Sequence, residues 1–209
     1  MDIEVLKEKQ NELRRKVILK PLDTEIKYIA GCDSAFRGEL INSVFVILEY
    51  KTLRVVEIKN LVSHTDFPYI PGFLAFREAP NLLNVYKTLS IKPDLIMVDG
   101  HGISHPRGLG IASHLGVLLN IPTIGVAKSL LVGKYKKPCM KKGCSEIVYF
   151  NGKVVAYALR SKDDTQEIFV SPGHLIDLNS ALSVVLNTLR GYRLPEPIRL
   201  ADYYSRKFL

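Results

Sequence analysis

Three apolar runs of this chain each end on a charged side chain of a type that binds metal ions or phosphate. Asp33 follows residues 26–32, Asp99 follows residues 95–98, and Lys128 ends a third run. Such runs are typical of buried strands, and ligands of open α/β sheets bind beyond the carboxyl ends of strands. Two carboxylates at one sheet edge repel unless a cation or a shared proton intervenes, and a divalent metal is the natural solution. The pattern predicts a metal site there.

Glu78 is a third candidate ligand, because it lies on the core-facing stripe of a predicted helix, between Leu74 and Leu82 at steps of four. A buried carboxylate is costly unless it is paired, so we expect Glu78 to join the two aspartates. The alternative is a surface salt bridge to a neighbouring Arg or Lys. Pro80 fits best in a first helical turn, which predicts that the helix starts near Ala79.

Polar residues between Asp99 and Lys128 extend this chemistry. His105 and Arg107 lie in a glycine-rich turn, and His114 lies on the predicted helix that follows. Histidine and lysine beside a metal site orient water, transfer protons or hold phosphate. Two plainer interpretations stay open: a solvated polar turn, and a His114 that is satisfied within the core.

The composition favours a globular protein with a polyanionic partner. The 209 residues suit one domain over 1–209, and a net charge of +8 with a pI near 9.3 points first to nucleic acid. No apolar run approaches the ~20 residues that span a bilayer. The charged N-terminal segment is not a secretory signal. We therefore expect a cytoplasmic protein without a membrane partner, and a monomer.

Cys139 and Cys144 are two of only three cysteines, which is too few for a disulfide framework. A zinc site would need two more ligands, and this region has no histidine, so we expect no zinc. Free thiols are the default for a cytosolic chain. A disulfide between these two is the alternative if the source is a hyperthermophile.

The remaining elements follow from periodicity and turn signals. Residues 2–16 predict an amphipathic helix, and 134–143 form a lysine-rich segment that either binds a phosphate backbone or is a plain solvated loop. The predicted strands are 26–32, 43–50, 53–59, 95–98, 122–127, 145–150, 153–159 and 167–170, and the predicted later helices are 178–189 and 198–209. The first three strands predict an antiparallel meander.

The order Asp, Glu, Asp on strand one, a helix and strand four, after an early meander, is the layout of the ribonuclease H-like fold. The predicted fold class is therefore α/β: a central mixed sheet with an antiparallel three-strand meander, flanked by helices. Its acidic ligands suit Mg²⁺, which is hard and octahedral and keeps water for a substrate phosphate. Mn²⁺ is also compatible with carboxylate oxygens.

Four longer motifs resemble the endonuclease V family. They are GCDSAF at Gly31–Phe36, PYIPGFLAFREAP at Pro68–Pro80, VDGHGISHPRGLGIASHLG at Val98–Gly116 and PTIGVAKSLL at Pro122–Leu131. They cover roughly the first two thirds of the chain in the family's order. The family more often has a valine-serine pair after the first aspartate, where this chain has Ser34-Ala35, but the aspartate is retained. Beyond Val132 the likeness is less diagnostic.

The resemblance implies a DNA repair endonuclease that recognises deoxyinosine and hydrolyses the phosphodiester one nucleotide to its 3′ side with Mg²⁺. It implies that Asp33, Asp99 and Glu78 hold the metal, directly or through water. It also implies that Lys128 contacts the scissile phosphate or the attacking water. These four are the expected catalytic residues.

The same resemblance assigns a wedge and a base pocket. Tyr69 is expected to fill the gap left by an extruded base, stiffened by Pro68, Ile70 and Pro71, because flipping costs least for a poorly paired base. The expected pocket residues are Gly72, Leu74, Gly100 and His105. Four further residues are expected either to contact phosphate or to lie beside the metal ligands: Arg77, Arg107, His114 and, more weakly, Asp202.

Other functions stay open on the sequence. An inosine-specific endoribonuclease would use the same carboxylates, and only a preference for the 2′-hydroxyl would separate it. A noncatalytic nucleic-acid binder would have no reason to crowd three carboxylates near phosphate. The sequence does not rank damaged DNA against inosine-containing RNA or single strands, nor inosine against uracil, abasic or mismatched sites, and it does not give the number of metal ions.

Overall fold

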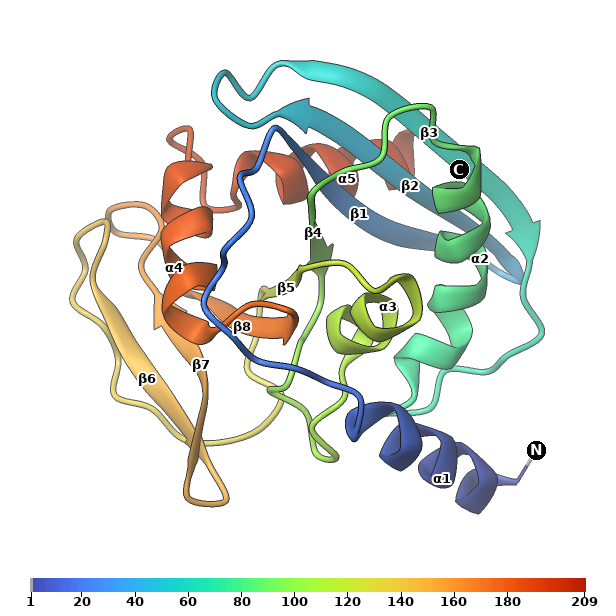
Figure 1. Ribbon diagram of the computed structural model, residues 1–209, viewed down its shortest axis with the longest axis horizontal. Helices are drawn as coiled ribbons and strands as arrows, with labels where there is room; N and C mark the ends of the chain where they lie inside the picture. Colours follow the sequence, from blue (N-terminus) through green and yellow to red (C-terminus); the bar gives the residue numbers. More distant parts are fainter. Residues whose placement is uncertain (1) are drawn as a thin grey trace.

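The computed structural model describes residues 2–209, which form one eight-stranded sheet with helices on both faces (Figure 1). The helices are α1 (Ile3–Arg14), α2 (Leu74–Thr88), α3 (Ile111–Leu119), α4 (Leu178–Asn187) and α5 (Glu196–Lys207). The strands are β1 (Tyr28–Arg37), β2 (Leu40–Glu49), β3 (Val55–His64), β4 (Leu95–Asp99), β5 (Thr123–Ala127), β6 (Ser145–Phe150), β7 (Lys153–Leu159) and β8 (Ile168–His174). No helix of this described part is long and apolar enough to cross a membrane.

The strand order is β3-β2-β1-β4-β5-β8-β7-β6. The first three strands form the predicted antiparallel meander, and β1, β4 and β5 are parallel neighbours at the centre. Strands β8, β7 and β6 extend the sheet in antiparallel fashion. The predicted α/β class with a central mixed sheet is therefore confirmed.

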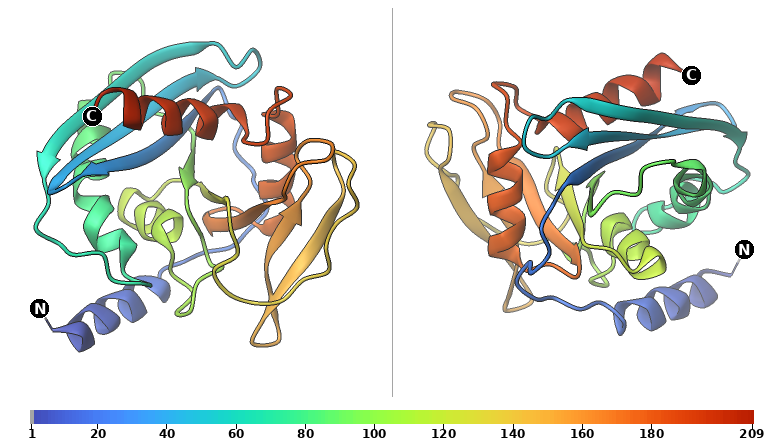
Figure 2. Two further views of the ribbon diagram at one scale, coloured as in Figure 1. Left: turned by 180° about the vertical axis from the view of Figure 1, so that it is seen from behind. Right: turned by 45° about the horizontal axis from the view of Figure 1, so that its top comes forward.

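Side chains that alternate along the central strands build a core on each face of the sheet. Ile96 and Val98 of β4 join the core under α2 and α3, whereas Leu95 and Met97 join the core under α4 and α5. This is the period of two that any strand imposes. Figure 2 shows α5 lying across the meander on the face opposite α2 and α3.

Helix α5 approaches β1 unusually closely at Gly31. A Cβ built on Gly31 would lie 1.9 Å from the carbonyl oxygen of Pro197, in the first turn of α5. Only glycine leaves room for this backbone contact. The glycine of the GCDSAF motif therefore sets the depth at which α5 packs.

Two sequence-based boundaries near the site are wrong. Strand β1 continues past Asp33 to Arg37, because each of these residues pairs with β2. Helix α2 begins at Leu74, not near Ala79, and holds Pro80 in its interior. An interior proline costs about 3 kcal/mol, but the earlier start buries Ala75 and Glu78 against the sheet.

The expectation of free thiols is also wrong for one pair: Cys139 and Cys144 form a disulfide, with Cα atoms 5.6 Å apart. The buried Arg160 side chain organises this loop, because it donates to the carbonyl oxygens of Pro138 and Cys139, each at 3.1 Å. Arg160 is itself ion-paired with Glu167 at 2.9 Å. The lysine-rich segment is thus an ordered loop on a buried anchor.

Candidate active site

Asp33 and Asp99 lie side by side at the centre of the sheet. Strands β1 and β4 pair in parallel with Cys32 opposite Val98, and each aspartate follows one residue later. Cys32 and Val98 face the α2 side, so alternation turns both carboxylates to the α5 side. The predicted meeting of two carboxylates from neighbouring parallel strands is what the structure shows.

Helix α5 brings Asp202 to the same place. One carboxylate oxygen from each of Asp33, Asp99 and Asp202 lies within 4.8 Å of the others, and we call these three the carboxylate cluster. The Ser205 hydroxyl, one turn later on α5, donates to Asp33 Oδ2 at 2.8 Å. Arg206 donates to Asp202 Oδ1 at 2.8 Å. The structure therefore places Asp202 closer to the two strand aspartates than the sequence suggested.

Lys128 bridges two members of the cluster. Its Nζ donates to Asp99 Oδ2 at 2.5 Å and to Asp202 Oδ1 at 2.6 Å. Its backbone is fixed from the segment that precedes α5, because Arg193 Nη2 donates to the carbonyl oxygens of Lys128 and Glu167 at 2.8 and 2.9 Å. The ammonium group is thus held where it offsets negative charge.

The electrostatics show a site with more negative charge than it can stabilise alone. Burial and the neighbouring Asp99 raise the pKa of Asp33 to about 7. Burial also raises the pKa of Asp99, although Lys128 opposes the shift. Burial lowers the pKa of Lys128, but the two carboxylates outweigh this and hold its pKa above the usual value. A further cation would relieve the remaining repulsion.

Glu78 is buried beside this cluster, with 6% of its surface exposed. Burial raises its pKa well above the usual value, and the charges of Asp33 and Asp99 raise it further. Among residues 2–209 it forms no ion pair, so the surface salt bridge is not what the structure shows. It reaches the site from α2, across the sheet from α5, and its oxygens lie outside the group of three.

The donor set fits a hard divalent cation. The carboxylate cluster offers three oxygen ligands from three different elements, with no sulfur or imidazole among them. Mg²⁺ and Mn²⁺ prefer such ligands. A metal ion bound here would lie beside the Lys128 ammonium, which already contacts two of the three carboxylates.

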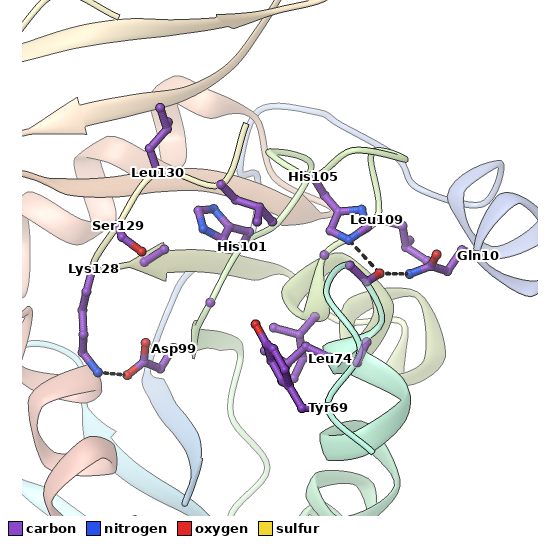
Figure 3. Close-up of a pocket in the computed structure, with 17 residues that line it drawn as sticks. Gln10, Tyr69, Leu74, Asp99, His101, His105, Leu109, Lys128, Ser129 and Leu130 are labelled. Atoms are coloured by element: carbon purple, nitrogen blue, oxygen red, sulfur yellow. Dashed lines mark hydrogen bonds and ion pairs between the residues drawn. The ribbon is translucent and has the colours of Figure 1, made fainter. Parts of the chain in front are cut away.

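A pocket of about 340 Å³ opens next to the cluster, and we call it the Tyr69 pocket. Figure 3 shows Asp99 and Lys128 on one side of it and Tyr69, His105 and Gln10 on the other. All four residues predicted for a base pocket line it: Gly72, Leu74, Gly100 and His105. Tyr69 is 64% exposed, and Pro68 and Pro71 beside it are exposed as well.

The carbonyl oxygen of Gly72 is the hub of the pocket wall. It accepts from Gln10 Nε2 at 2.9 Å and from Arg107 Nη2 at 2.6 Å, and it lies 3.1 Å from His105 Nε2. Gly72 has φ +81°, a left-handed conformation that favours glycine. Arg107 Nε also donates to Gln10 Oε1. The loop that carries Tyr69 is thereby fastened to both α1 and the glycine-rich turn.

The histidines of this region are neutral. Burial lowers the pKa of His101, His105 and His114 to about 4 in each case. The Arg107 amide donates to His105 Nδ1, so Nε2 carries the proton that reaches Gly72. His114 is buried and packs edge-on against Phe76, but its Nδ1 has no hydrogen-bond partner among the described residues, so its polar atoms are not all satisfied within the core.

The two predicted phosphate-contacting arginines both pack on aromatic rings. Arg77 lies over the ring of Phe36 at 4.0 Å, and Arg107 lies over the ring of Phe73 at 4.3 Å. Arg77 makes no ion pair with the neighbouring Glu78 among the described residues. Both guanidinium groups therefore also brace the elements around the site.

Sequence reasoning missed three residues and underrated one. Gln10 was visible only as a polar residue on the apolar stripe of α1, where it is 1% exposed. Ser205 and Arg193 carry no local signal, because the site residues that they contact, Asp33 and Lys128, are 172 and 65 residues away in the sequence. Asp202 lies in the part of the chain where the likeness to a family is weakest.

Comparison with known proteins identifies the family of this chain. The family model described as Endonuclease V matches residues 11–203. Endonuclease V of Dictyoglomus turgidum is 50% identical over 200 residues, which cover 96% of this chain and 88% of that relative.

Solved structures agree. The crystal structure of endonuclease V from Streptomyces avermitilis superposes with a TM-score of 0.93 at 38% identity, covering 98% of this chain and 92% of that one. Ciona intestinalis endonuclease V, crystallised with a 24mer DNA containing an inosine followed by a ribo-adenosine, has a TM-score of 0.85 at 32% identity. That alignment covers 99% of this chain and 97% of the other.

Proposed function

The chain belongs to the endonuclease V family, and from this membership we propose that it is a DNA repair endonuclease for deoxyinosine. In this proposal it hydrolyses the phosphodiester one nucleotide to the 3′ side of the lesion with a divalent metal, Mg²⁺ or Mn²⁺. It acts as a monomer of one domain, 1–209, on DNA in the cytoplasm. The observation that carries the proposal is the carboxylate cluster at the mouth of the Tyr69 pocket.

The pocket supports recognition of an extruded base. Its volume of about 340 Å³ is at the lower end of the range for small-molecule sites. Tyr69 is exposed at the edge of the pocket, between two prolines that already restrict the backbone. Its ring can therefore fill the gap in the base stack at little further cost in conformational entropy. Gly72 and Gly100 line the pocket with backbone, which lets a base approach closely and leaves little room for an exocyclic amino group.

The buried polar contacts support a rigid pocket, not a proton-transfer role for its histidine. His105 is neutral because burial lowers its pKa to about 4, and both ring nitrogens are engaged, by Gly72 and by the Arg107 amide. Its place is to hold the loop that carries Tyr69. Gln10 does the same from α1.

The cluster supports hydrolysis of a phosphodiester. Asp33, Asp99 and Asp202 would hold the metal, with Glu78 beside them, and a bound ion supplies an activated water and stabilises charge on the departing oxygen. Lys128 stays protonated because its carboxylate neighbours raise its pKa. Its ammonium group is therefore available to a phosphate oxygen.

Inosine-containing RNA is a second candidate substrate. The Ciona intestinalis relative was crystallised with DNA whose inosine is followed by a ribo-adenosine, which bears a 2′-hydroxyl. An enzyme that prefers this group would cut the ribonucleotide-containing strand faster. The same carboxylates would serve both substrates.

The test is cleavage of an end-labelled duplex that carries one deoxyinosine, with Mg²⁺ and with chelator. We expect a metal-dependent nick one nucleotide 3′ of the lesion, and none from Asp99→Asn. A strand cut only when inosine lies in RNA would move the assignment to the ribonuclease. Inosine-specific binding without any cut would leave a noncatalytic binder.

A further inference from the structure

An open groove of about 640 Å³ lies on the exposed side of α5, and we call it the α5 groove. Its lining is a mixture of tyrosine and basic side chains: Tyr192, Arg199, Asp202, Tyr203, Arg206 and Lys207. Three of these six carry positive charge, against a single carboxylate. Basic side chains interleaved with aromatic rings are typical of surfaces that bind single nucleic-acid strands.

Both tyrosine rings of the α5 groove are exposed to solvent, and each packs against a side chain of α5. Tyr192 and Tyr203 are each 52% exposed. The Arg199 guanidinium lies over the Tyr192 ring at 4.4 Å, and Glu196 fixes that guanidinium through two hydrogen bonds of 2.6 and 2.7 Å. Tyr203 packs edge-on against Tyr204 at 5.0 Å. Such rings are oriented before any ligand arrives.

The α5 groove is continuous with the carboxylate cluster. Asp202 belongs to both, and one turn of α5 on each side of it places Arg199 and Arg206 on the same helix face. The Tyr69 pocket meets the cluster through Asp99 and Lys128 instead. The Lys128 ammonium, which contacts both aspartates, lies between the two cavities.

This arrangement defines a path for a strand. A base held in the Tyr69 pocket and a scissile phosphate at the cluster leave the continuing strand on the side of Asp202. Because the proposed cut lies 3′ of the lesion, that continuing strand is the 3′ one. Its phosphates would meet Arg199, Arg206 and Lys207, and its bases would meet the two exposed rings.

We propose that the α5 groove binds the nucleotides on the 3′ side of the cleaved bond, with bases stacked on Tyr203 and Tyr192. The inference rests on the proposed function and adds a second nucleic-acid site to it. Base stacking on an aromatic ring is sequence-tolerant, because every base has a π face. The site therefore contributes affinity and strand position, whereas the Tyr69 pocket discriminates the lesion.

The test measures how affinity depends on the length of DNA on each side of the lesion. Labelled inosine oligonucleotides are lengthened one nucleotide at a time on the 3′ side, or on the 5′ side, and titrated with the full chain in chelator. Matched oligonucleotides carry adenine instead of inosine. The variants are Tyr203→Ala, Tyr192→Ala, their combination and Tyr203→Phe. Tyr149→Ala is the control, because Tyr149 on β6 is similarly exposed, at 50%.

For the native chain we expect affinity to rise as the 3′ flank lengthens. Tyr203→Ala should remove about fivefold or more of that gain and leave the 5′ dependence unchanged. Tyr203→Phe should retain it, because the ring and not the hydroxyl group carries the stacking. Tyr149→Ala should behave as native.

Two failures can be told apart. If inosine is still preferred over adenine but the 3′ gain is the same in every variant, the α5 groove inference is overturned while the proposed function stands. If no oligonucleotide distinguishes inosine from adenine, the proposed function fails first. Equal loss on both flanks in Tyr203→Ala would show a general defect of α5 and would also overturn the inference.

Discussion

Lys128 makes the carboxylate cluster tolerable in the absence of a metal ion, since its ammonium contacts Asp99 and Asp202 at 2.5 and 2.6 Å. A divalent ion bound by the cluster would need oxygens of the same two aspartates. In the proposed function the lysine would compete for these oxygens before a metal binds and would be free to contact phosphate afterwards. The effect of Lys128 on metal binding can therefore be tested separately from its effect on cleavage.

We expect Lys128→Met to bind Mg²⁺ as tightly as the native chain or more tightly, because the competing ammonium is gone. The cleavage rate should fall by about 10² or more, in the range for loss of one stabilising group. Calorimetric Mg²⁺ titration and single-turnover cleavage measure the two effects. Lys51→Met, at the exposed turn after β2, is the control for loss of one charge. Weaker Mg²⁺ binding would contradict the competition.

Because burial and Asp99 raise the pKa of Asp33 to about 7, we expect metal binding by the cluster to depend on pH. Below that pH a proton competes with the ion, so the apparent Mg²⁺ affinity should rise as pH rises through about 7. A Mg²⁺ affinity that does not change between pH 6 and 8, about one unit on either side of this pKa, would contradict the prediction.

Through Asp33, the free energy of unfolding of the metal-free chain should depend on pH in the direction opposite to Mg²⁺ affinity. The ordinary pKa of 3.8 applies to the unfolded chain, so the contribution of Asp33 is present below 3.8 and is lost as pH rises through about 7. The three histidines, with pKa lowered to about 4, contribute the other way, because stability from them is gained as pH rises from 4 towards 6.5. The difference in melting temperature with and without Mg²⁺ at each pH isolates the carboxylates.

At the scale of single residues, the sequence predicted that acidic side chains would meet at the sheet, but it did not predict which of them lie closest together. Asp33 and Asp99 end apolar runs, which is a local signal, and their strands are parallel neighbours. Asp202 lies on an ordinary amphipathic helix, so the sequence offered it only as a weaker candidate, and tertiary packing brings it into the cluster. The unusual Ser34 is also explained: its hydroxyl pairs with that of Ser43 at 2.7 Å on the next strand, and alternation turns it away from the cluster.

Two elements position the site from outside the sheet, α5 through Gly31 and α1 through Gln10. Gly31→Ala would put a methyl group into the carbonyl of Pro197, so α5 must move and carry Asp202 with it. We expect a loss of about 1–3 kcal/mol in the free energy of unfolding. The cleavage rate of the folded fraction should fall as well, which denaturant titration and single-turnover kinetics separate. Native kinetics in this variant would show that α5 depth does not matter.

Gln10 links α1 to the loop that carries Tyr69 through the Gly72 carbonyl. Gln10→Leu keeps the volume but removes the hydrogen bonds to Gly72 and Arg107, at a cost of about 1–3 kcal/mol. We expect KM for inosine DNA to rise more than kcat falls, with unchanged Mg²⁺ affinity. Asn11→Leu, exposed on the same helix, is the control. A fall in kcat alone would contradict this role.

The elements themselves were largely predictable, and their ends were not. Alternation and turn residues predicted the meander and both strands of the later hairpin. Strand β1 extends beyond Asp33, however, because its later residues continue to pair with β2. Pro80 is a local signal that tertiary burial overrides. The Cys139–Cys144 pair depends on Arg160, which no local pattern connects to that loop.

At the scale of the whole molecule, one sheet carries two carboxylates of the candidate site while its two faces are covered by different helices. Asp33 and Asp99 are built into central strands, Glu78 comes from the helix on one face, and Asp202 from the helix on the other. The motifs that carry the family resemblance end near Leu131 and therefore omit α5. This is why the sequence predicted the family and four residues that line the Tyr69 pocket, but not the third member of the cluster.

The division of the cluster between sheet and helix also has a thermal consequence. Central strands open only when the whole protein unfolds, whereas a single amphipathic surface helix opens at lower free energy. The cluster is intact only while α5 remains docked. On heating, activity should therefore disappear several degrees before the strand signal in circular dichroism is lost, and cooling before that second transition should restore it. Coincident loss of both signals would mean that α5 and the sheet melt as one unit.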